Sequence, residues 1–271
     1  MLRIAILQYP VLWADKEGNL RLVEQRIRRL RGKADIALLP EMFSTGFCTE
    51  RPELAEYNDG MTLQRLQRLS NSSGVAIVGS FIAREDVTTC LNEREQVQTL
   101  LYNRGFMVRP NDTPLFVDKR HLYAHGGEDR FFTPGDRPVI WEYMGVKIRL
   151  LICYDVRFPV WARNRSGSDY DLLLVVANWP EARVQYFDAL LVARAIENQC
   201  YIAAVNPVGD DGMGIHYNGH SVAYDTWLHR LAELKDNESG TRIATFDIEA
   251  LHHFRSVMPQ WKDADPFTLH S

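Results

Sequence analysis

Short apolar segments that alternate with amphipathic segments constrain the fold of this chain more than any other feature. Residues 3–8, 35–39 and 75–81 are apolar runs of strand length, and the segments between them carry apolar residues at three- and four-residue spacings. The first intervening segment begins at Asn19, a residue type that favours helix N-caps, and the second covers residues 61–69. This β-α-β-α-β order predicts helices packed over a sheet.

The rest of the chain is rich in predicted strands. Two strand pairs joined by tight turns are expected at residues 98–108 with 113–117 and at residues 139–143 with 146–153. Further strands are expected at residues 172–177, 201–205, 221–224, 229–234 and 242–247, with helices over 182–198 and from 250 onward. Two sets of strands with helices between them favour a sandwich of two sheets covered by helices.

Chain-wide properties set limits on size, partners and location. No linker rich in Pro, Gly or Ser divides the 271 residues, so we expect one domain over 1–271, with 256–271 as a C-terminal tail. The net charge of −4 favours neither nucleic acid nor anionic lipid. The basic stretch 26–33 contains Ile27 and Leu30 at helical spacing, which predicts the solvated face of a helix. With no membrane-length apolar run and no signal-peptide pattern, we expect a cytoplasmic protein.

The four cysteines form no metal-binding or disulfide pattern. They stand at positions 48, 90, 153 and 200, without a CxxC pair. We interpret Cys48, Cys90 and Cys200 as buried structural thiols, because free cysteine behaves as a small hydrophobic residue in protein cores. No metal-ligand motif is present, so neither a metal nor an organic cofactor is predicted.

Three chemically distinct side chains stand at the ends of predicted strands. Cys153 ends the apolar run 146–153, Glu41 follows 36–40, and Lys119 follows 114–118. In open α/β sheets, chemistry gathers at the carboxyl ends of strands. A thiol, a carboxylate and an ammonium at such positions predict amide hydrolysis through a thioester.

Each of the three residues has a chemical interpretation and a structural alternative. An unperturbed thiol is only a few per cent thiolate at neutral pH, so Cys153 needs a base or a cation; otherwise it is a core thiol. Glu41 is expected to act as that base, and its alternative is a solvated turn residue. Lys119 is expected beside the developing oxyanion together with the backbone N–H of Tyr154; its alternative is a solvated loop.

These segments resemble the carbon–nitrogen hydrolase (nitrilase) superfamily. The resemblance is carried by residues 38–43 (LLPEMF), 118–122 (DKRHL) and 153–159 (CYDVRFP), in the order Glu, Lys, Cys, and it extends over nearly the whole chain. Within the superfamily, the chain is most similar to the bacterial ω-amidase branch. That similarity is carried by residues 158–164, 177–180, 193–198, 209–217 and 219–221.

The resemblance implies a fold, an assembly and a set of catalytic residues. The implied fold is an α/β four-layer αββα sandwich of two mixed β-sheets, and the implied assembly is a homodimer. Glu41 would be the general base, Lys119 the oxyanion stabiliser and Cys153 the nucleophile. Glu128 stands where relatives often carry a supporting catalytic carboxylate, with Asp129 as its rival and a solvent-exposed turn as the alternative.

Other residues are expected to line the substrate pocket. Asn178 and Trp179 follow the predicted strand 172–177, which would place them at the same sheet edge; a rigid surface loop is the alternative. Arg157 is interpreted as structural, holding the loop after Cys153 through an ion pair with Asp155 or another acid. The group that binds a distal substrate carboxylate stays open among Arg130, Arg157 and backbone amides.

The resulting hypothesis is a cysteine-dependent amidase that needs no cofactor. Its expected substrate is a small ω-amide of a dicarboxylic acid, of the α-ketoglutaramate or α-ketosuccinamate type, which gives the acid and ammonia. A nitrile, a carbamoyl amine or another amide is the alternative substrate within the superfamily. A small-molecule binding protein without catalysis and a peroxide sensor at Cys153 are alternatives of other classes, although no second cysteine lies near Cys153 in sequence.

Overall fold

A computed structural model describes residues 1–91, 94–165 and 169–269 of the chain; the side chains of residues 89–91 and 94–95 fall outside the description. Five α-helices occur in the described residues: α1 (Lys16–Arg28), α2 (Met61–Ser73), α3 (Pro159–Ala162), α4 (Val184–Asn198) and α5 (Ile248–Val257). Short 3-10 helices lie between several elements: η1 (Pro52–Leu54), η2 (Ala124–Gly126), η3 (Glu128–Arg130), η4 (Cys153–Arg157), η5 (Glu181–Arg183) and η6 (Gln260–Asp263).

The first sheet is built mainly from the N-terminal half of the chain. Its six strands lie in the order β14 (Gly240–Phe246), β1 (Leu2–Gln8), β2 (Ile36–Leu38), β3 (Ala76–Leu91), β4 (Arg94–Val108) and β5 (Leu115–Asp118). Strands β1, β2 and β3 are parallel, as expected for the β-α-β-α-β opening, and the other neighbours pair antiparallel.

The second sheet has the same number of strands and a similar mixed topology. Its order is β13 (Arg230–Glu233), β12 (Val222–Tyr224), β9 (Tyr201–Val205), β8 (Leu172–Val176), β7 (Val146–Ile152) and β6 (Ile140–Tyr143). The central strands β7, β8 and β9 are parallel, and every residue of β8 and β9 is buried. A small two-stranded sheet of β10 (Val208–Asp210) and β11 (His216–Asn218) is separate.

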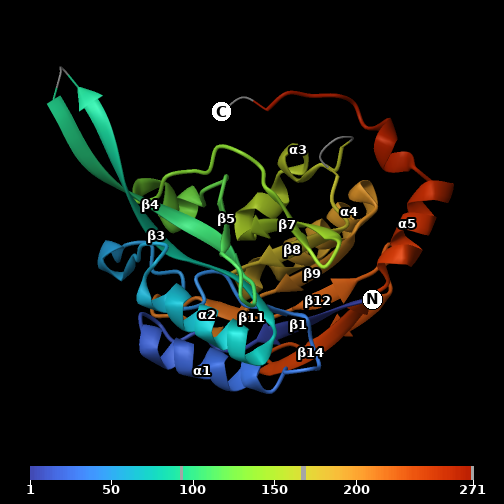
Figure 1. The fold of residues 1–271 in the computed structure, drawn as a ribbon, viewed down its shortest axis with the longest axis horizontal. Helices are drawn as coiled ribbons and strands as arrows, with labels where there is room; N and C mark the ends of the chain where they lie inside the picture. Colours follow the sequence, from blue (N-terminus) through green and yellow to red (C-terminus); the bar gives the residue numbers. More distant parts are fainter. Residues whose placement is uncertain (92–93, 166–168, 270–271) are drawn as a thin grey trace.

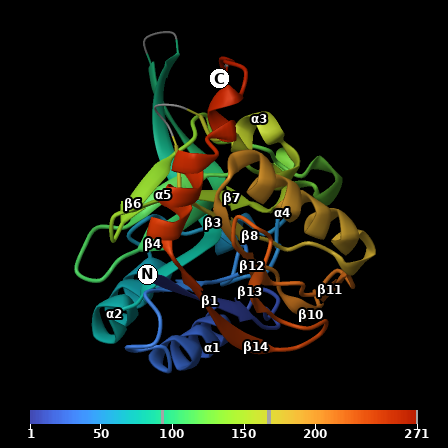
Figure 2. The ribbon, with the colours of Figure 1, turned by 90° about the vertical axis from the view of Figure 1, so that its right-hand side faces the viewer.

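The two sheets face each other, with helices on their outer sides (Figures 1 and 2). In β1, Ile4 and Ile6 belong to the core between the sheets, whereas Ala5 and Leu7 pack against α1 and α2 on the other face. This alternation follows from the two-residue period of a strand. Helix α4 covers the outer face of the second sheet, so the four layers run helix, sheet, sheet, helix. The predicted αββα sandwich is confirmed.

Two local predictions differ from the structure, and one strand pair was not predicted. Helix α1 begins earlier than expected, because Asp15 accepts the cap hydrogen bond from the Gly18 N–H at 2.9 Å; Asn19 lies inside the first turn. Buried Asn19 instead bonds the Leu12 backbone, so its side chain holds a loop. The third predicted strand continues far past residue 81 and forms with β4 a long antiparallel ribbon, which projects beyond the sheet in Figure 1. The pair β10–β11 was not predicted from the sequence.

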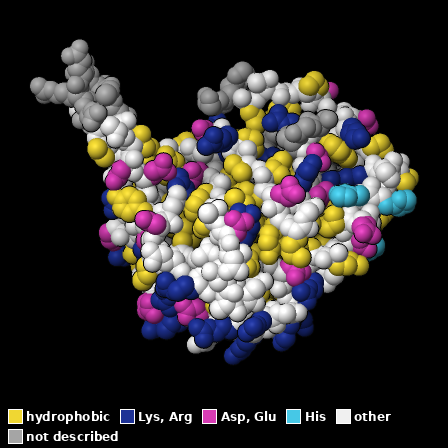
Figure 3. All heavy atoms as spheres, viewed as in Figure 1, with side chains coloured by type: hydrophobic (Ala, Val, Ile, Leu, Met, Phe, Trp, Pro, Cys, Tyr) yellow, Lys and Arg dark blue, Asp and Glu magenta, His cyan; other side chains and the backbone are white. Residues whose placement is uncertain are grey.

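The basic stretch 26–33 is largely solvated, whereas the C-terminal segment is packed more closely than a tail. Basic side chains gather over α1 at the lower edge of Figure 3, where Arg28 is exposed and Ile27 is buried, as the amphipathic pattern predicted. The predicted tail begins within α5, and Trp261 in η6 is buried. None of the helices in the described residues combines the length and apolar character needed to cross a bilayer.

Candidate active site

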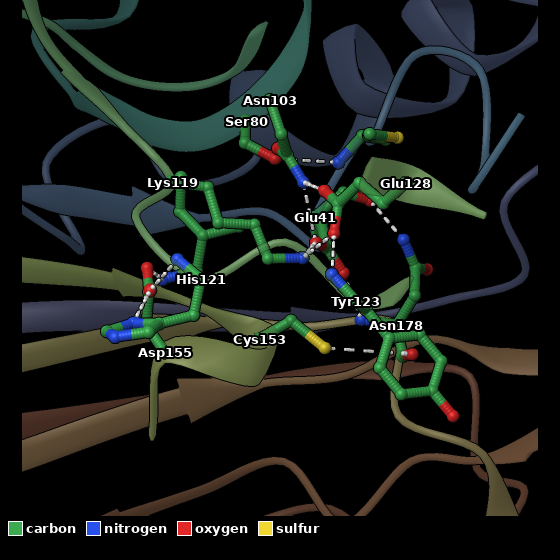
Figure 4. A network of polar contacts seen from close by, with 12 residues as sticks. Glu41, Ser80, Asn103, Lys119, His121, Tyr123, Glu128, Cys153, Asp155 and Asn178 are labelled. Carbon is green, nitrogen blue, oxygen red and sulfur yellow. Dashed lines mark hydrogen bonds and ion pairs between the residues drawn. The ribbon is translucent and has the colours of Figure 1, made fainter. Parts of the chain in front are cut away.

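The ends of strands from both sheets meet at one point of the interior. Glu41 follows β2 and Lys119 follows β5 in the first sheet, while Cys153 follows β7 and Asn178 follows β8 in the second. Figure 4 shows these side chains grouped together. Because they come from opposing sheets, only the sandwich brings them into contact.

The centre of the group is a buried ammonium between two carboxylates. Lys119 Nζ donates to Glu41 Oε1 at 2.8 Å and to Glu128 Oε2 at 2.8 Å, and all three side chains have no exposed surface. Glu128 lies on η3 and also accepts from the Tyr123 backbone N–H at 2.7 Å. Asp129, the rival acid, is exposed to solvent. The buried position belongs to Glu128.

Asn103 completes this cluster and was not among the sequence predictions. Its Nδ2 donates to Glu41 Oε1 at 2.7 Å and to Glu128 Oε1 at 2.8 Å (Figure 4). A signal was present in the sequence, since Asn103 is an amide within the apolar strand segment 98–108. Asn103 lies on the same face of β4 as Gly105, because side chains alternate along a strand. This face is turned toward β7 of the second sheet, since a Cβ on Gly105 would lie 2.5 Å from the side chain of Leu150.

Cys153 occupies a sharp turn at the end of β7. Its φ of 46° is in the left-handed region, which is uncommon for a residue with a Cβ and occurs often at functional sites. The residue is 8 % exposed, and its Sγ–H donates to the Asn178 carbonyl at 3.9 Å. Tyr154 follows at the second position of η4, where a backbone N–H has no partner within the helix.

Burial controls the protonation of the cluster. Desolvation raises the pKa of Cys153 well above 9, with a further contribution from the charge of Glu41 that Lys119 partly opposes. Desolvation also raises the pKa of Glu128. For Lys119, burial acts to lower the pKa, but the charges of Glu128 and Glu41 outweigh it and the pKa is raised. The resting site therefore holds a protonated thiol and a charged ammonium.

A pocket of about 730 Å³ opens onto the thiol. Cys153 and Asn178 reach its wall, and Glu41, Lys119 and Glu128 lie behind them in the interior. The volume suits a small organic ligand. Aromatic side chains contribute much of the lining: Trp13, Phe47, Tyr123, Tyr154, Trp179 and Tyr217.

The predicted pocket residues lie where the sequence placed them, at the strand ends. Asn178 anchors Glu41: its backbone N–H donates to Glu41 Oε2 at 2.9 Å, and its Nδ2 donates to the Glu41 carbonyl at 2.8 Å. Trp179 is buried, and its Nε1 donates to the Arg183 carbonyl at 2.7 Å. Asn178, Trp179 and Tyr154 all line the pocket.

The expected ion pair between Arg157 and Asp155 does not form. Asp155 Oδ1 instead accepts from the His121 backbone N–H at 2.9 Å and lies 2.8 Å from His121 Nδ1, while Oδ2 accepts from the Ile152 N–H at 3.3 Å. Asp155 thus links the segment after Lys119 to the strand that ends at Cys153, a role that the sequence did not reveal.

Arg157 instead places its guanidinium near three aromatic rings, of which those of Trp179 and Tyr154 line the pocket. It lies 5.0 Å from the ring centroid of Trp179, 5.5 Å from that of Tyr186 and 5.8 Å from that of Tyr154. Arg157 has no acidic partner among the described residues and lines the pocket. Arg130 also lines the pocket but is exposed.

The other described cysteines are core thiols, and the described residues contain no metal-binding cluster. Cys48 and Cys200 are buried, as predicted, and Cys48 also borders the pocket. The expectation for Cys90 concerns a side chain outside the described set. Among the described residues, no three or more His, Cys, Asp or Glu side chains are grouped so that they would hold a metal ion.

Comparison with known proteins agrees with this geometry. The family model described as carbon-nitrogen hydrolase matches residues 3–256. The chain belongs to the carbon–nitrogen hydrolase family. The family resemblance and the enzyme class predicted from the sequence, a hydrolase of carbon–nitrogen bonds, are thereby confirmed.

Individual members of the carbon–nitrogen hydrolase family cover nearly the whole chain. It is 38% identical to Omega-amidase YafV of Escherichia coli, over 99% of this chain and 98% of that protein. It is 31% identical to 2-oxoglutaramate amidase of Bacillus subtilis, over 96% of both chains. Among solved structures, a CN-hydrolase superfamily protein of Xanthomonas campestris, with an arsenic adduct in its active site, matches with a TM-score of 0.89, 34% identity and 99% coverage of both chains.

Proposed function

We propose that this protein is an ω-amidase, which hydrolyses the terminal carboxamide of a small dicarboxylic monoamide such as α-ketoglutaramate or α-ketosuccinamate. The observation that carries the proposal is one pocket with a buried Glu41–Lys119–Glu128 cluster behind Cys153 and the guanidinium of Arg157 in its wall. Names of the relatives support the substrate class, since one is called an omega-amidase and another a 2-oxoglutaramate amidase.

Acylation begins with proton transfer from the thiol. Because the pKa of Cys153 is raised by burial, the sulfur needs a base as it attacks the amide carbon, and Glu41 takes its proton. Lys119 has three N–H donors and uses two on the carboxylates, so one is left for the developing oxyanion. The Tyr154 backbone N–H is the second oxyanion donor.

Collapse of this intermediate breaks the carbon–nitrogen bond. The nitrogen takes the proton from Glu41 and leaves as ammonia, and the acyl group stays on Cys153 as a thioester. Glu41 then removes a proton from water, whose oxygen attacks the thioester carbon. The second intermediate releases the carboxylic acid, and the thiolate recovers its proton from Glu41. Atoms and charges balance without a cofactor.

Glu128 supports these steps without contacting the reacting carbon. It shares Lys119 with Glu41 and receives the Tyr123 N–H, so it holds the ammonium at a fixed place. Breaking a buried ion pair by removing one partner typically costs about 3–5 kcal/mol. We therefore assign Glu128 the role of positioning Lys119.

Arg157 is proposed to bind the distal carboxylate of the substrate. A half-buried guanidinium that has aromatic neighbours and no acidic partner among the described residues presents its donors to a ligand. Guanidinium groups match carboxylates with two parallel hydrogen bonds. The neighbouring rings exclude water on the sides of the guanidinium, which strengthens such a pair. Asn178 and Trp179 are proposed as pocket walls, with Asn178 also orienting Glu41.

An ammonia-release panel tests the proposed function. α-Ketoglutaramate, α-ketosuccinamate and succinamate should be hydrolysed with a higher kcat/KM than simple nitriles and N-carbamoyl amino acids. Mass spectrometry of rapidly quenched reactions should find the acyl group on Cys153. A preference for nitriles or carbamoyl compounds would overturn the substrate assignment, and binding without turnover or adduct would overturn the enzymatic assignment.

Assembly and domain organisation remain proposals of the same kind. We propose a single carbon–nitrogen hydrolase domain that forms a homodimer, as the family resemblance implies. Exposed apolar side chains on α3, α4 and α5, among them Val160, Ile196 and Val257, are consistent with a buried face in the assembly. Light scattering after size exclusion should give about twice the chain mass of 31.2 kDa. The cytoplasmic location stays a prediction.

A further inference from the structure

A closed ring of hydrogen bonds joins four buried side chains behind the nucleophile. Asn103 Nδ2 and Lys119 Nζ each donate to both Glu41 and Glu128, at 2.7 and 2.8 Å for the amide and at 2.8 Å for both ammonium contacts. Glu41 accepts both donors on Oε1, whereas Glu128 accepts Asn103 on Oε1 and Lys119 on Oε2. Figure 4 shows Asn103 and Lys119 on either side of the two acids.

The ring addresses a charge problem that Lys119 alone does not solve. One ammonium faces two carboxylates, and none of these side chains is exposed. Like charges held together in a dry interior raise each other's proton affinity until one of them is protonated. A neutral donor to both acids reduces that repulsion and leaves the single positive charge unchanged. Asn103 supplies two N–H groups, one for each carboxylate.

The placement of Asn103 indicates that its amide serves the carboxylates. Its Oδ1 has no hydrogen-bond partner among the described residues, although the side chain is fully buried. A buried acceptor without a partner is costly, so the two donated bonds must outweigh it. The Asn103 carbonyl also accepts from the Lys119 backbone N–H at 3.0 Å. One residue of strand β4 thus contacts all three members of the cluster.

We propose that Asn103 is a positioning residue that holds Glu41 and Glu128 in separate orientations around Lys119 and keeps Glu41 available as the base. This inference rests on the proposed role of Glu41. A lysine at this position would bind both acids too strongly for Glu41 to accept a proton. An aliphatic residue would leave the two acids without the neutral donor that bridges them, so that Glu41 would lose one of the contacts that hold its orientation.

The test compares Asn103→Leu and Asn103→Asp with the wild-type enzyme. For Asn103→Leu we expect a 10- to 100-fold lower kcat, since general-base catalysis contributes about 10²–10⁴-fold in total and only its positioning is impaired. KM should stay within threefold, because the binding contacts in the pocket are unchanged. The acid limb of kcat/KM should move to higher pH, because charge-stabilising donors are lost. Asn103→Asp adds a third acid and should move that limb further. Besides the ring, the charged or titratable groups near these acids are Cys153 and Tyr217.

A matched control separates positioning from general destabilisation. Val108→Ala leaves a cavity in the same strand β4, on the face packed against the helices, and should lower the melting temperature without moving the pH profile. The proposal would be overturned if Asn103→Leu and Val108→Ala had the same kcat and the same pH profile of kcat/KM. It would also be overturned if the pH profile of Asn103→Leu were that of the wild-type enzyme.

A second measurement needs no amide substrate. The pH dependence of Cys153 carboxamidomethylation by iodoacetamide, followed by peptide mass spectrometry, reports proton transfer from the thiol to its base. We expect this profile to move toward higher pH in Asn103→Leu and to stay in place in Val108→Ala. If ω-amides are not turned over while the alkylation profile moves, the substrate assignment fails and the positioning role stands. If the profile stays in place in Asn103→Leu, the positioning role fails.

Discussion

Removing the charge of Arg157 gives the sharpest test of the substrate class. In Arg157→Met an unbranched apolar side chain, shorter than that of arginine, stays beside the aromatic rings, but the guanidinium and its donors for a carboxylate are lost. A hydrogen bond to a charged group contributes about 1.5–3 kcal/mol. Since 1.4 kcal/mol is about a factor of ten, kcat/KM for succinamate should fall about 10- to 100-fold. The partial exposure of Arg157 favours the lower part of that range, because solvent screens the charge.

The comparison substrate and the control variant make this test specific. Butyramide resembles succinamate in length but has no carboxylate, so its kcat/KM should change less than threefold in Arg157→Met. Arg51→Met is the control, because Arg51 borders the same pocket but already pairs with Glu53. Ammonia release with both amides is the assay. An equal loss for succinamate and butyramide would show that Arg157 holds the loop and does not recognise the carboxylate.

Three further predictions concern the cluster itself. Cys153→Ala should keep its unfolding temperature within a few degrees and lose ammonia release entirely; turnover in that variant would exclude a thioester route. Lys119→Met should lower kcat by about 10²–10³-fold through loss of an oxyanion donor and destabilise the fold by about 3–5 kcal/mol, because two buried acids lose their cation. Urea unfolding and steady-state rates measure both effects, and a stable, active Lys119→Met would contradict them. Burial raises the pKa of Glu128 in the folded protein above 4.5, so the native state binds a proton that the unfolded state releases. The free energy of unfolding should therefore fall as pH rises from 4.5 through the folded pKa, by up to about 1.4 kcal/mol per pH unit. Glu128→Gln should lack this decline, and an unchanged slope in urea titrations at several pH values would refute the prediction.

The sequence alone contained most of the architecture. Strand β9 lies where its apolar run predicted it, and β8 has the fully buried pattern expected of a central strand. Local pattern was insufficient where polar residues continue a strand. Ile82 and Ala83 are still buried, but the ribbon of β3 and β4 then continues through charged residues such as Arg84 and Glu85, where cross-strand backbone pairing persists.

The candidate site was predicted in part, because local sequence pattern marks the ends of strands but not the contacts between distant segments. Glu41, Lys119 and Cys153 were found because each stands at the end of an apolar strand, a position that can be read along the chain. Asn103 lies within a strand, where its only local mark is a polar amide in a strand segment, and Asp155 bonds across to the segment after Lys119. Their roles depend on partners that are distant in sequence.

The amino-acid sequence by itself determined which segments become strands and helices, and which reactive side chains stand at strand ends, because periodicity and burial act over a few neighbouring residues. Only the tertiary structure decided that one ammonium is shared by two acids, that an amide bridges those acids and that Arg157 faces rings instead of Asp155. These contacts join strands and loops that lie far apart in the sequence and side by side in one sheet or at its edge. The distances between such segments are not encoded in any short stretch of the chain.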